Sequence, residues 1–165
     1  MLEKIDLNKK MSKQEYSESL PKIEAELGRL QRECKDLDIP VMIVFEGFGA
    51  SGKGLQIGKL IHSMDPRGFE VHTIKNETEE EWMHPFLWRF WIKTPEKGKI
   101  AVFDGSWYRK VWVDRFEKRT REKELKDDFA SINAFEQQLS EGTNQKVISF
   151  LAAQMEKAEE KKIKE

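Results

Sequence analysis

A glycine-rich stretch containing a lysine follows the apolar run at residues 41–45, and it has the spacing G-x-x-x-x-G-K. Glycines can take positive φ and carry no Cβ, so successive backbone N–H groups in such a stretch can surround phosphate oxygens. The lysine adds a mobile cation. We therefore expect a phosphate-binding loop built from Gly47, Gly49, Ser51, Gly52, Lys53 and Gly54.

The segments on either side of this loop fit the same chemistry. Residues 41–45 predict a strand, and the spacing of apolar residues in 54–61 predicts a helix whose N-terminus favours anions. Gly54 stands where this pattern usually has Ser or Thr, whose hydroxyl helps to hold magnesium. The alternative interpretation is an ordinary strand-to-helix turn with an exposed lysine.

A second apolar run, at residues 99–103, ends in Asp104. A carboxylate at the carboxyl end of a buried parallel strand, beside a phosphate loop, is the arrangement that holds magnesium in many phosphoryl-transfer sites. We expect Asp104 to be a magnesium ligand, and the alternative is that it caps a helix.

The elements that must position these groups begin with a long helix. Ser12 and Glu15 have capping-box spacing, and apolar residues follow at intervals of three and four. Pro21 predicts two helices, or one that restarts there. Residues 69–75 alternate as a strand does, Thr78 is a candidate helix cap, and residues 125–142 and 147–151 predict a helix and a strand. This alternation indicates a three-layer α/β domain with a mainly parallel sheet and an anion site at the strand C-termini.

Two other groups of residues leave alternatives open. Helical spacing of Trp82, Phe86, Leu87, Phe90 and Trp91 predicts a helix after Thr78. Trp82, Trp88 and Trp91 could stack on a nucleobase, but aromatic residues at helical spacing favour core or interface positions. Residues 118–123 are strongly charged, and either a solvated loop or a contact to a phosphate chain would account for them.

Length and composition narrow the class of protein. At 165 residues we expect one domain, with an N-terminal arm and helices at 1–40, a core at 41–151 and a C-terminal helix at 152–165. The net charge of −1 gives no global field for nucleic acid or an anionic membrane, so we expect neither as a partner. One cysteine, no signal-peptide core and no long apolar run favour a cytoplasmic protein.

The runs FEGFGASGKG, DPRGFEV, FDGSWYRKVWVDR and INAFEQQL, in this order, resemble the polyphosphate kinase 2 family. The resemblance covers about residues 20 to 160 and implies a P-loop kinase-like fold of the thymidylate-kinase type. It also implies magnesium-dependent phosphoryl transfer between inorganic polyphosphate and ADP- or AMP-type nucleotides. The loop and Lys53 would hold phosphates, Asp104 would place magnesium, and Arg115 matches a family arginine near the polyphosphate path.

The departures from the family pattern are specific. The family usually has Asp at the position of Gly49, Arg at that of Gly105 and Asn at that of Arg109. The chain also stops where family members begin a lid. This pattern looks like the amino-terminal, motif-altered half of two-domain members, so we expect a homodimer or assembly with a second family domain.

Three functions follow as hypotheses. The first is a polyphosphate-dependent nucleotide phosphotransferase in which Arg109 or Arg115 guides the acceptor phosphate. The second is a catalytically degenerate module of the same family that binds phosphate or dimerises. The third, with less support, is an ATP-dependent small-molecule kinase.

Overall fold

The computed structural model describes residues 11–47, 51–116, 122–142 and 145–151. Its strands are β1 (Val41–Glu46), β2 (Phe69–Thr73), β3 (Ile100–Asp104) and β4 (Lys146–Leu151). Its helices are α1 (Lys13–Asp36), α2 (Lys53–His62), α3 (Glu79–Trp82), α4 (Trp88–Trp91), α5 (Tyr108–Phe116) and α6 (Glu122–Gln137). A 3-10 helix spans Pro66–Gly68, and a π-helical turn, Gln138–Gly142, continues α6.

The described strands form one parallel sheet in the order β2-β3-β1-β4. Val41 pairs with Ile100 and Phe45 with Asp104, so β1 and β3 start and end at nearly the same level. Parallel strands carry all of their carboxyl ends to one edge. The predicted phosphate loop and Asp104 therefore lie at the same edge, on neighbouring strands.

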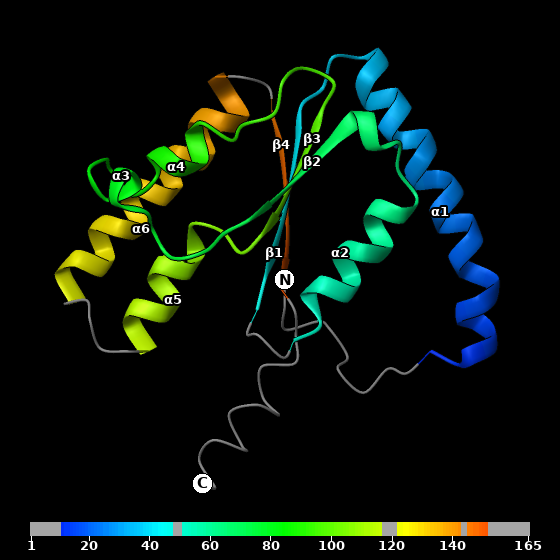
Figure 1. Ribbon diagram of the computed structural model, residues 1–165, viewed down its shortest axis with the longest axis horizontal. Coiled ribbons are helices and arrows are strands. Elements are labelled where there is room, and N and C mark those ends of the chain that lie inside the picture. The colour runs from blue at the N-terminus through cyan, green and yellow to red at the C-terminus, as the bar shows by residue number, and fades with distance from the viewer. Residues whose placement is uncertain (1–10, 48–50, 117–121, 143–144, 152–165) are drawn as a thin grey trace, which may run out of the picture.

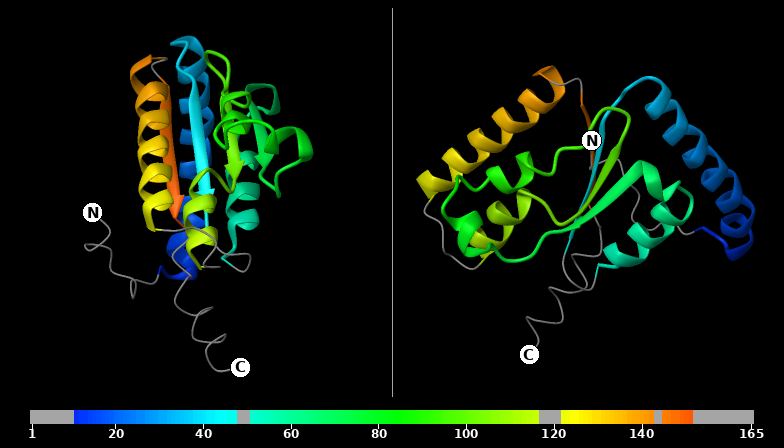
Figure 2. Two further views of the ribbon diagram at one scale, coloured as in Figure 1. Left: turned by 90° about the vertical axis from the view of Figure 1, so that its left-hand side faces the viewer. Right: turned by 45° about the horizontal axis from the view of Figure 1, so that its top comes forward.

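Helices cover both faces of the sheet. Figure 1 shows α1 and α2 on one side of the strands and α3 to α6 on the other, and Figure 2 shows the same layers from two further directions. One buried cluster joins β1 and β3 to α4, α5 and α6, and includes Phe103, Trp107 and Phe135. The other lies under α1 and α2, and includes Val102 and Ile57. The predicted three-layer α/β class is confirmed.

Two capping predictions are confirmed. Ser12 and Glu15 form a reciprocal capping box at the start of α1, with Glu15 N donating to Ser12 Oγ at 3.1 Å and Ser12 N donating to Glu15 Oε2 at 2.8 Å. Thr78 and Glu81 do the same at the start of α3. Each box satisfies two backbone donors that a helix N-terminus would otherwise leave without partners.

Pro21 does not divide the first helix. The structure has a single helix, α1, with Pro21 inside it, so the expectation of two helices is wrong. A proline removes one backbone donor and strains one turn, but packing of later turns can hold the helix together. Gln31 supplies such packing: its Nε2 donates to Asp65 O at 2.9 Å, and Asp65 N donates to its Oε1 at 2.7 Å.

The aromatic segment after β2 also differs from a single helix. It forms two short helices, α3 and α4, with Pro85 between them. Trp91 packs against the core, but Trp82 is 76% exposed, so the core or interface expectation holds for Trp91 and a core position is wrong for Trp82. Trp88 stacks on His84 with centroids 4.0 Å apart. The predicted arm at 1–10, most of the charged segment at 118–123 and the predicted helix at 152–165 lie outside the described residues.

Candidate functional site

The predicted phosphate loop connects β1 to α2. Gly47 has φ 142° and Gly52 has φ 83°, and Gly52 is the N-cap of α2. Both φ values lie in the region that only glycine enters without strain, which explains the glycines at these two positions. Gly49 lies outside the described residues. The side chain of Ser51 is partly buried, and its Oγ has no hydrogen-bond partner in the described part of the chain, as expected of a group that faces a ligand position.

Lys53 is the first residue of α2, and its Nζ donates a hydrogen bond to Gly47 O. The structure therefore brings the cation back to the residue that follows β1, near the N-terminus of α2, which adds partial positive charge. Gly54 follows in the first turn of α2, and a Cβ built there meets no atom within 4 Å.

Asp104 ends β3, one strand away from the loop. Its backbone is held on both sides, because Ile74 N donates to Asp104 O at 3.0 Å and Gly105 N donates to Phe45 O at 2.9 Å. The first backbone donor of α5, Tyr108 N, bonds to Ser106 Oγ at 3.2 Å. Ser106 therefore occupies the capping role that was the alternative interpretation of Asp104.

Glu46 joins the strand of the loop to the turn after Asp104. Ser106 Oγ donates a hydrogen bond to Glu46 Oε1. Burial raises the pKa of the Glu46 carboxyl, while the Ser106 hydrogen bonds and the Lys53 cation act in the opposite direction. Neither Glu46 nor Ser106 was assigned a role from the sequence. The available signal was that each comes at or just after the end of a buried strand, where parallel strands collect polar side chains.

A second carboxylate orients the segment that follows. Glu136 Oε1 on α6 accepts from Trp107 Nε1 at 2.9 Å and from Tyr108 OH. Trp107 is 1% exposed, so this contact holds the start of α5 against α6 from inside the core. Burial, with help from Glu136, raises the pKa of Tyr108 to about 12. Sequence patterns gave no indication of Glu136, because its partners are 28 and 29 residues away.

The structure describes the side chain of Arg109 but not that of Arg115. Arg109 is exposed, with Nη1 3.4 Å from Ile74 O and Nη2 3.4 Å from Asn76 Oδ1, so it lies over the segment after β2 at the loop edge of the sheet. Both bonds are long, so phosphate oxygens could replace them at little cost. Arg115 lies in α5, and its side chain is outside the described part of the structure.

Gly105 has φ 82°, a conformation that L side chains rarely adopt. A Cβ there would meet Ile74 Cβ at 3.6 Å, which is ordinary contact, so the obstacle to a larger residue is the backbone and not space. An arginine at this position would be strained by ~1–2 kcal/mol.

A single carboxylate at Asp104 is compatible with magnesium binding. The described residues contain no group of three His, Cys, Asp or Glu side chains that could hold a metal ion. Magnesium does not need such a group, because it commonly uses one or two carboxylates, water and substrate phosphates. Asp104 ends β3 at the same edge of the sheet as the predicted phosphate loop, and its carboxylate would be the protein ligand.

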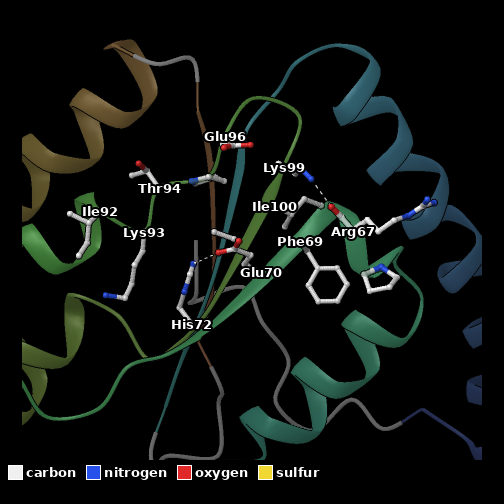
Figure 3. A pocket seen from close by; sticks show the side chains of 13 residues that line it. Arg67, Phe69, Glu70, His72, Ile92, Lys93, Thr94, Glu96, Lys99 and Ile100 are labelled. Atoms are coloured by element: carbon white, nitrogen blue, oxygen red, sulfur yellow. Dashed lines mark hydrogen bonds and ion pairs between the residues drawn. The ribbon is translucent and has the colours of Figure 1, made fainter.

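A pocket of about 530 Å³ lies elsewhere, at the open edge of β2. Figure 3 shows Glu70, His72, Lys93 and Lys99 around it. Its strand residues include Phe69 and Ile100, which start β2 and β3, so it lies toward the amino ends of these strands. Lys99 Nζ donates to Arg67 O at 2.6 Å, and His72 Nε2 lies 3.7 Å from Glu70 Oε2. This pocket of mixed charge is separate from the phosphate loop.

The sheet order, the glycine loop before α2 and the carboxylate that ends β3 define a P-loop kinase-like domain. A sequence model of Polyphosphate kinase 2 matches residues 10–165, and the chain belongs to the polyphosphate kinase 2 family. None of the helices in the described residues combines the length and apolar character needed to cross a bilayer.

Curated relatives and solved structures agree with this assignment. The chain is 38% identical over 141 residues to the polyphosphate:AMP phosphotransferase of Pseudomonas syringae, covering 86% of this chain and 28% of that protein. It is 32% identical over 111 residues to an ADP-polyphosphate phosphotransferase of Rhizobium meliloti, covering 67% of this chain and 39% of that protein. A crystal structure of a putative polyphosphate kinase 2 from Pseudomonas aeruginosa matches with a TM-score of 0.87 and 34% identity, over 99% of this chain and 35% of that one. The chain thus spans well under half the length of these relatives.

Proposed function

We propose that this chain transfers phosphoryl groups between inorganic polyphosphate and ADP- or AMP-type nucleotides. The observation that carries the proposal is the placement of the glycine loop with Lys53 and of Asp104 on neighbouring strands, at one edge of the sheet. The relatives named polyphosphate:AMP and ADP-polyphosphate phosphotransferases support the substrate class.

We assign a separate role in the reaction to the loop, to Lys53 and to Asp104. The loop amides and Lys53 hold and orient the transferred phosphoryl group, and an acceptor phosphate oxygen attacks its phosphorus in line. The new P–O bond forms as the bridging P–O bond of the donor breaks, and the donor becomes one phosphoryl group shorter. Magnesium, held by Asp104 and phosphate oxygens, would neutralise charge that develops on those oxygens.

Arg109 is the described arginine placed to steer the acceptor phosphate, because it is exposed at the loop edge of the sheet. Arg115 is the second candidate for this role. We also propose, from the sequence, a cytoplasmic location, a single domain over 1–165, and action as a homodimer or with a second family domain.

One observation favours a second candidate function, a phosphate-binding module without turnover. Gly105 stands where the family usually has arginine, and its φ of 82° does not suit a side chain. A charge that would stabilise the transition state is therefore absent from this position, and its backbone conformation opposes simple replacement.

The test is a titration of the protein with long-chain polyphosphate and with ADP, with and without magnesium, followed by an assay of ATP formation. Turnover well above that of a Lys53→Ala variant supports phosphoryl transfer. Binding that Lys53→Ala weakens, without turnover, supports the binding module. No turnover above that of Lys53→Ala, together with polyphosphate binding that is absent or equal in the two proteins, would overturn both.

A further inference from the structure

The pocket beside β2 exists because β3 has a small residue, Ala101, where a larger one would fill the space. Phe103, two positions later on the same face, pairs with His72 in the register of β2 and β3, and the two rings lie 5.1 Å apart. Ala101 pairs with Glu70 and carries only a methyl group, so the space above it stays open. The resulting volume of about 530 Å³ is within the range of ordinary small-molecule sites.

One end of the pocket is basic and mostly shielded from water. Figure 3 shows His72 of β2 and Lys93, in the segment after α4, on two sides of it, and their side chains are 18% and 26% exposed. Lys93 Nζ donates to Arg89 O at 3.0 Å and lies 3.7 Å from Glu81 Oε1, which fixes its position. An ammonium group has three protons, so at least one remains for a ligand.

A carboxylate already lies beside the His72 ring. Glu70 Oε2 is 3.7 Å from His72 Nε2, but the Glu70 side chain is 81% exposed. Burial lowers the pKa of His72, Glu70 raises it and Lys93 lowers it further, so both charges act on the ring. An exposed ion pair contributes little, so another anion can displace the Glu70 carboxylate from this position.

The other end of the pocket limits the kind of anion. Glu96 and Lys99 lie there, away from His72 (Figure 3), and their opposite charges leave this end close to neutral. A carboxylate accepts and an ammonium donates hydrogen bonds, so both can bind hydroxyl groups. Glu70, between the two ends, repels a ligand that is charged along its whole length, such as a polyphosphate chain. The pocket therefore suits a molecule with one anionic end and a neutral body that carries hydroxyl groups.

We propose that this pocket binds a small phosphate ester, such as a sugar phosphate, with the phosphate between His72 and Lys93. A phosphate group can accept from both donors at once, and its charge makes these bonds strong. The body of the ligand lies above Ala101, toward Glu96 and Lys99. This proposal does not rest on phosphoryl transfer, because the pocket lies toward the amino ends of β2 and β3, whereas the phosphate loop follows the carboxyl end of β1.

The first test is NMR of the three histidine rings during a titration with ribose 5-phosphate up to about 10 mM, with His72→Gln to assign the signals. We expect the His72 signals to shift and its pKa to rise, because a bound anion favours the charged ring. His62 and His84 should not respond, and Lys53→Ala should keep the His72 response, which separates this pocket from the phosphate loop. Ribose, inorganic triphosphate and succinate should bind at least about tenfold more weakly. No response of His72 to ribose 5-phosphate, or equal binding of any of these three ligands, would overturn the proposal.

The second test uses two substitutions with opposite expected effects on the same titration. Lys93→Gln should weaken binding at least about tenfold, because it removes a charged donor, and Glu70→Gln should strengthen it about threefold, because it removes the competing carboxylate. The matched control is Lys97→Gln, because Lys97 is exposed in the same turn but is not a lining residue of the pocket. The unfolding midpoint shows whether each variant keeps the fold, and Glu70→Gln, at an exposed position, tests the proposal even if Lys93→Gln lowers that midpoint. Equal effects of Lys93→Gln and Lys97→Gln, or no stronger binding by Glu70→Gln, would overturn the proposal.

Discussion

The Ser106 hydroxyl donates a hydrogen bond to the Glu46 carboxylate, and this bond connects the strand before the phosphate loop to the turn after Asp104. Ser106 also accepts from Tyr108 N, so the same oxygen starts α5. The phosphate loop and Asp104 were predicted from the sequence. Glu46 and Ser106, which connect the segments that carry them, were not. A change at Glu46 should affect both the stability and the geometry of the site.

Glu46→Gln should stabilise the protein at neutral pH. Burial raises the folded pKa of Glu46 above its usual 4.5, so the fold favours the protonated form. The unfolded chain releases this proton first, and stability falls as pH rises from 4.5 through the folded pKa. Glutamine can still accept the hydrogen bond from Ser106 and carries no charge. The fall in stability with rising pH should therefore disappear, and Tm near pH 7 should rise.

Thermal unfolding at a series of pH values checks this, with Glu80→Gln on α3 as an exposed control. The same variant should bind polyphosphate differently from the parent, because it removes a carboxylate that acts on Lys53. A pH profile of Tm identical to that of the parent would show that Glu46 does not titrate in this way.

Asp104→Asn should remove the effect of magnesium on polyphosphate binding. The carboxylate is the proposed protein ligand, and an amide oxygen is a weaker ligand for a hard cation. We expect the gain in affinity on adding magnesium to fall at least about tenfold, or 1.4 kcal/mol. Calorimetry with and without magnesium measures it, and Asp127→Asn, an exposed position on α6, is the control. If the effect of magnesium on polyphosphate affinity is unchanged, Asp104 is not a ligand of the metal.

Gly105→Arg should destabilise the fold and not simply restore a family feature. The left-handed φ of 82° makes any side chain costly, so Gly105→Arg and Gly105→Ala should each lower the free energy of unfolding by ~1–2 kcal/mol. Gly58→Ala on α2 is the matched control, because no atom lies within 4 Å of its Cβ position and its φ is not left-handed. That change should instead stabilise by ~0.4–1 kcal/mol. Urea unfolding measures the free energy of unfolding of the three variants. Equal effects of the changes at Gly105 and Gly58 would contradict backbone strain at residue 105.

Tyr108→Phe should lower stability by a constant amount at every pH, because a hydrogen bond is lost. The dependence of stability on pH should differ from that of the parent only in strong alkali. The folded pKa of Tyr108 is about 12 against a usual value of 10, through burial and Glu136. Its contribution is complete below pH 10 and is lost as pH rises through about 12. The parent should lose stability in this window faster than Tyr108→Phe, as followed by circular dichroism. Parallel alkaline curves for the two proteins would refute the role of Tyr108.

Local signals were read correctly from the sequence. The strand before the glycine stretch, the helix after it and the strand that ends at Asp104 depend on residues close in the chain, and the structure has all three as expected. The capping boxes at Ser12 and Thr78 are equally local. Each of these features involves backbone conformation or hydrogen bonds across a few residues, which residue type and spacing determine.

Tertiary structure decided the features that depend on distant partners. α1 continues through Pro21 while later turns of the helix are held by contacts such as that of Gln31 with Asp65, 34 residues away. Ser106 reaches Glu46 from 60 residues away, and Glu136 reaches Tyr108 from 28. Spacing cannot predict such contacts, because the strand order sets which side chains meet at the edge of the sheet. The sequence alone predicted the type of chemistry, and the packing of the layers determined which side chains surround the predicted site.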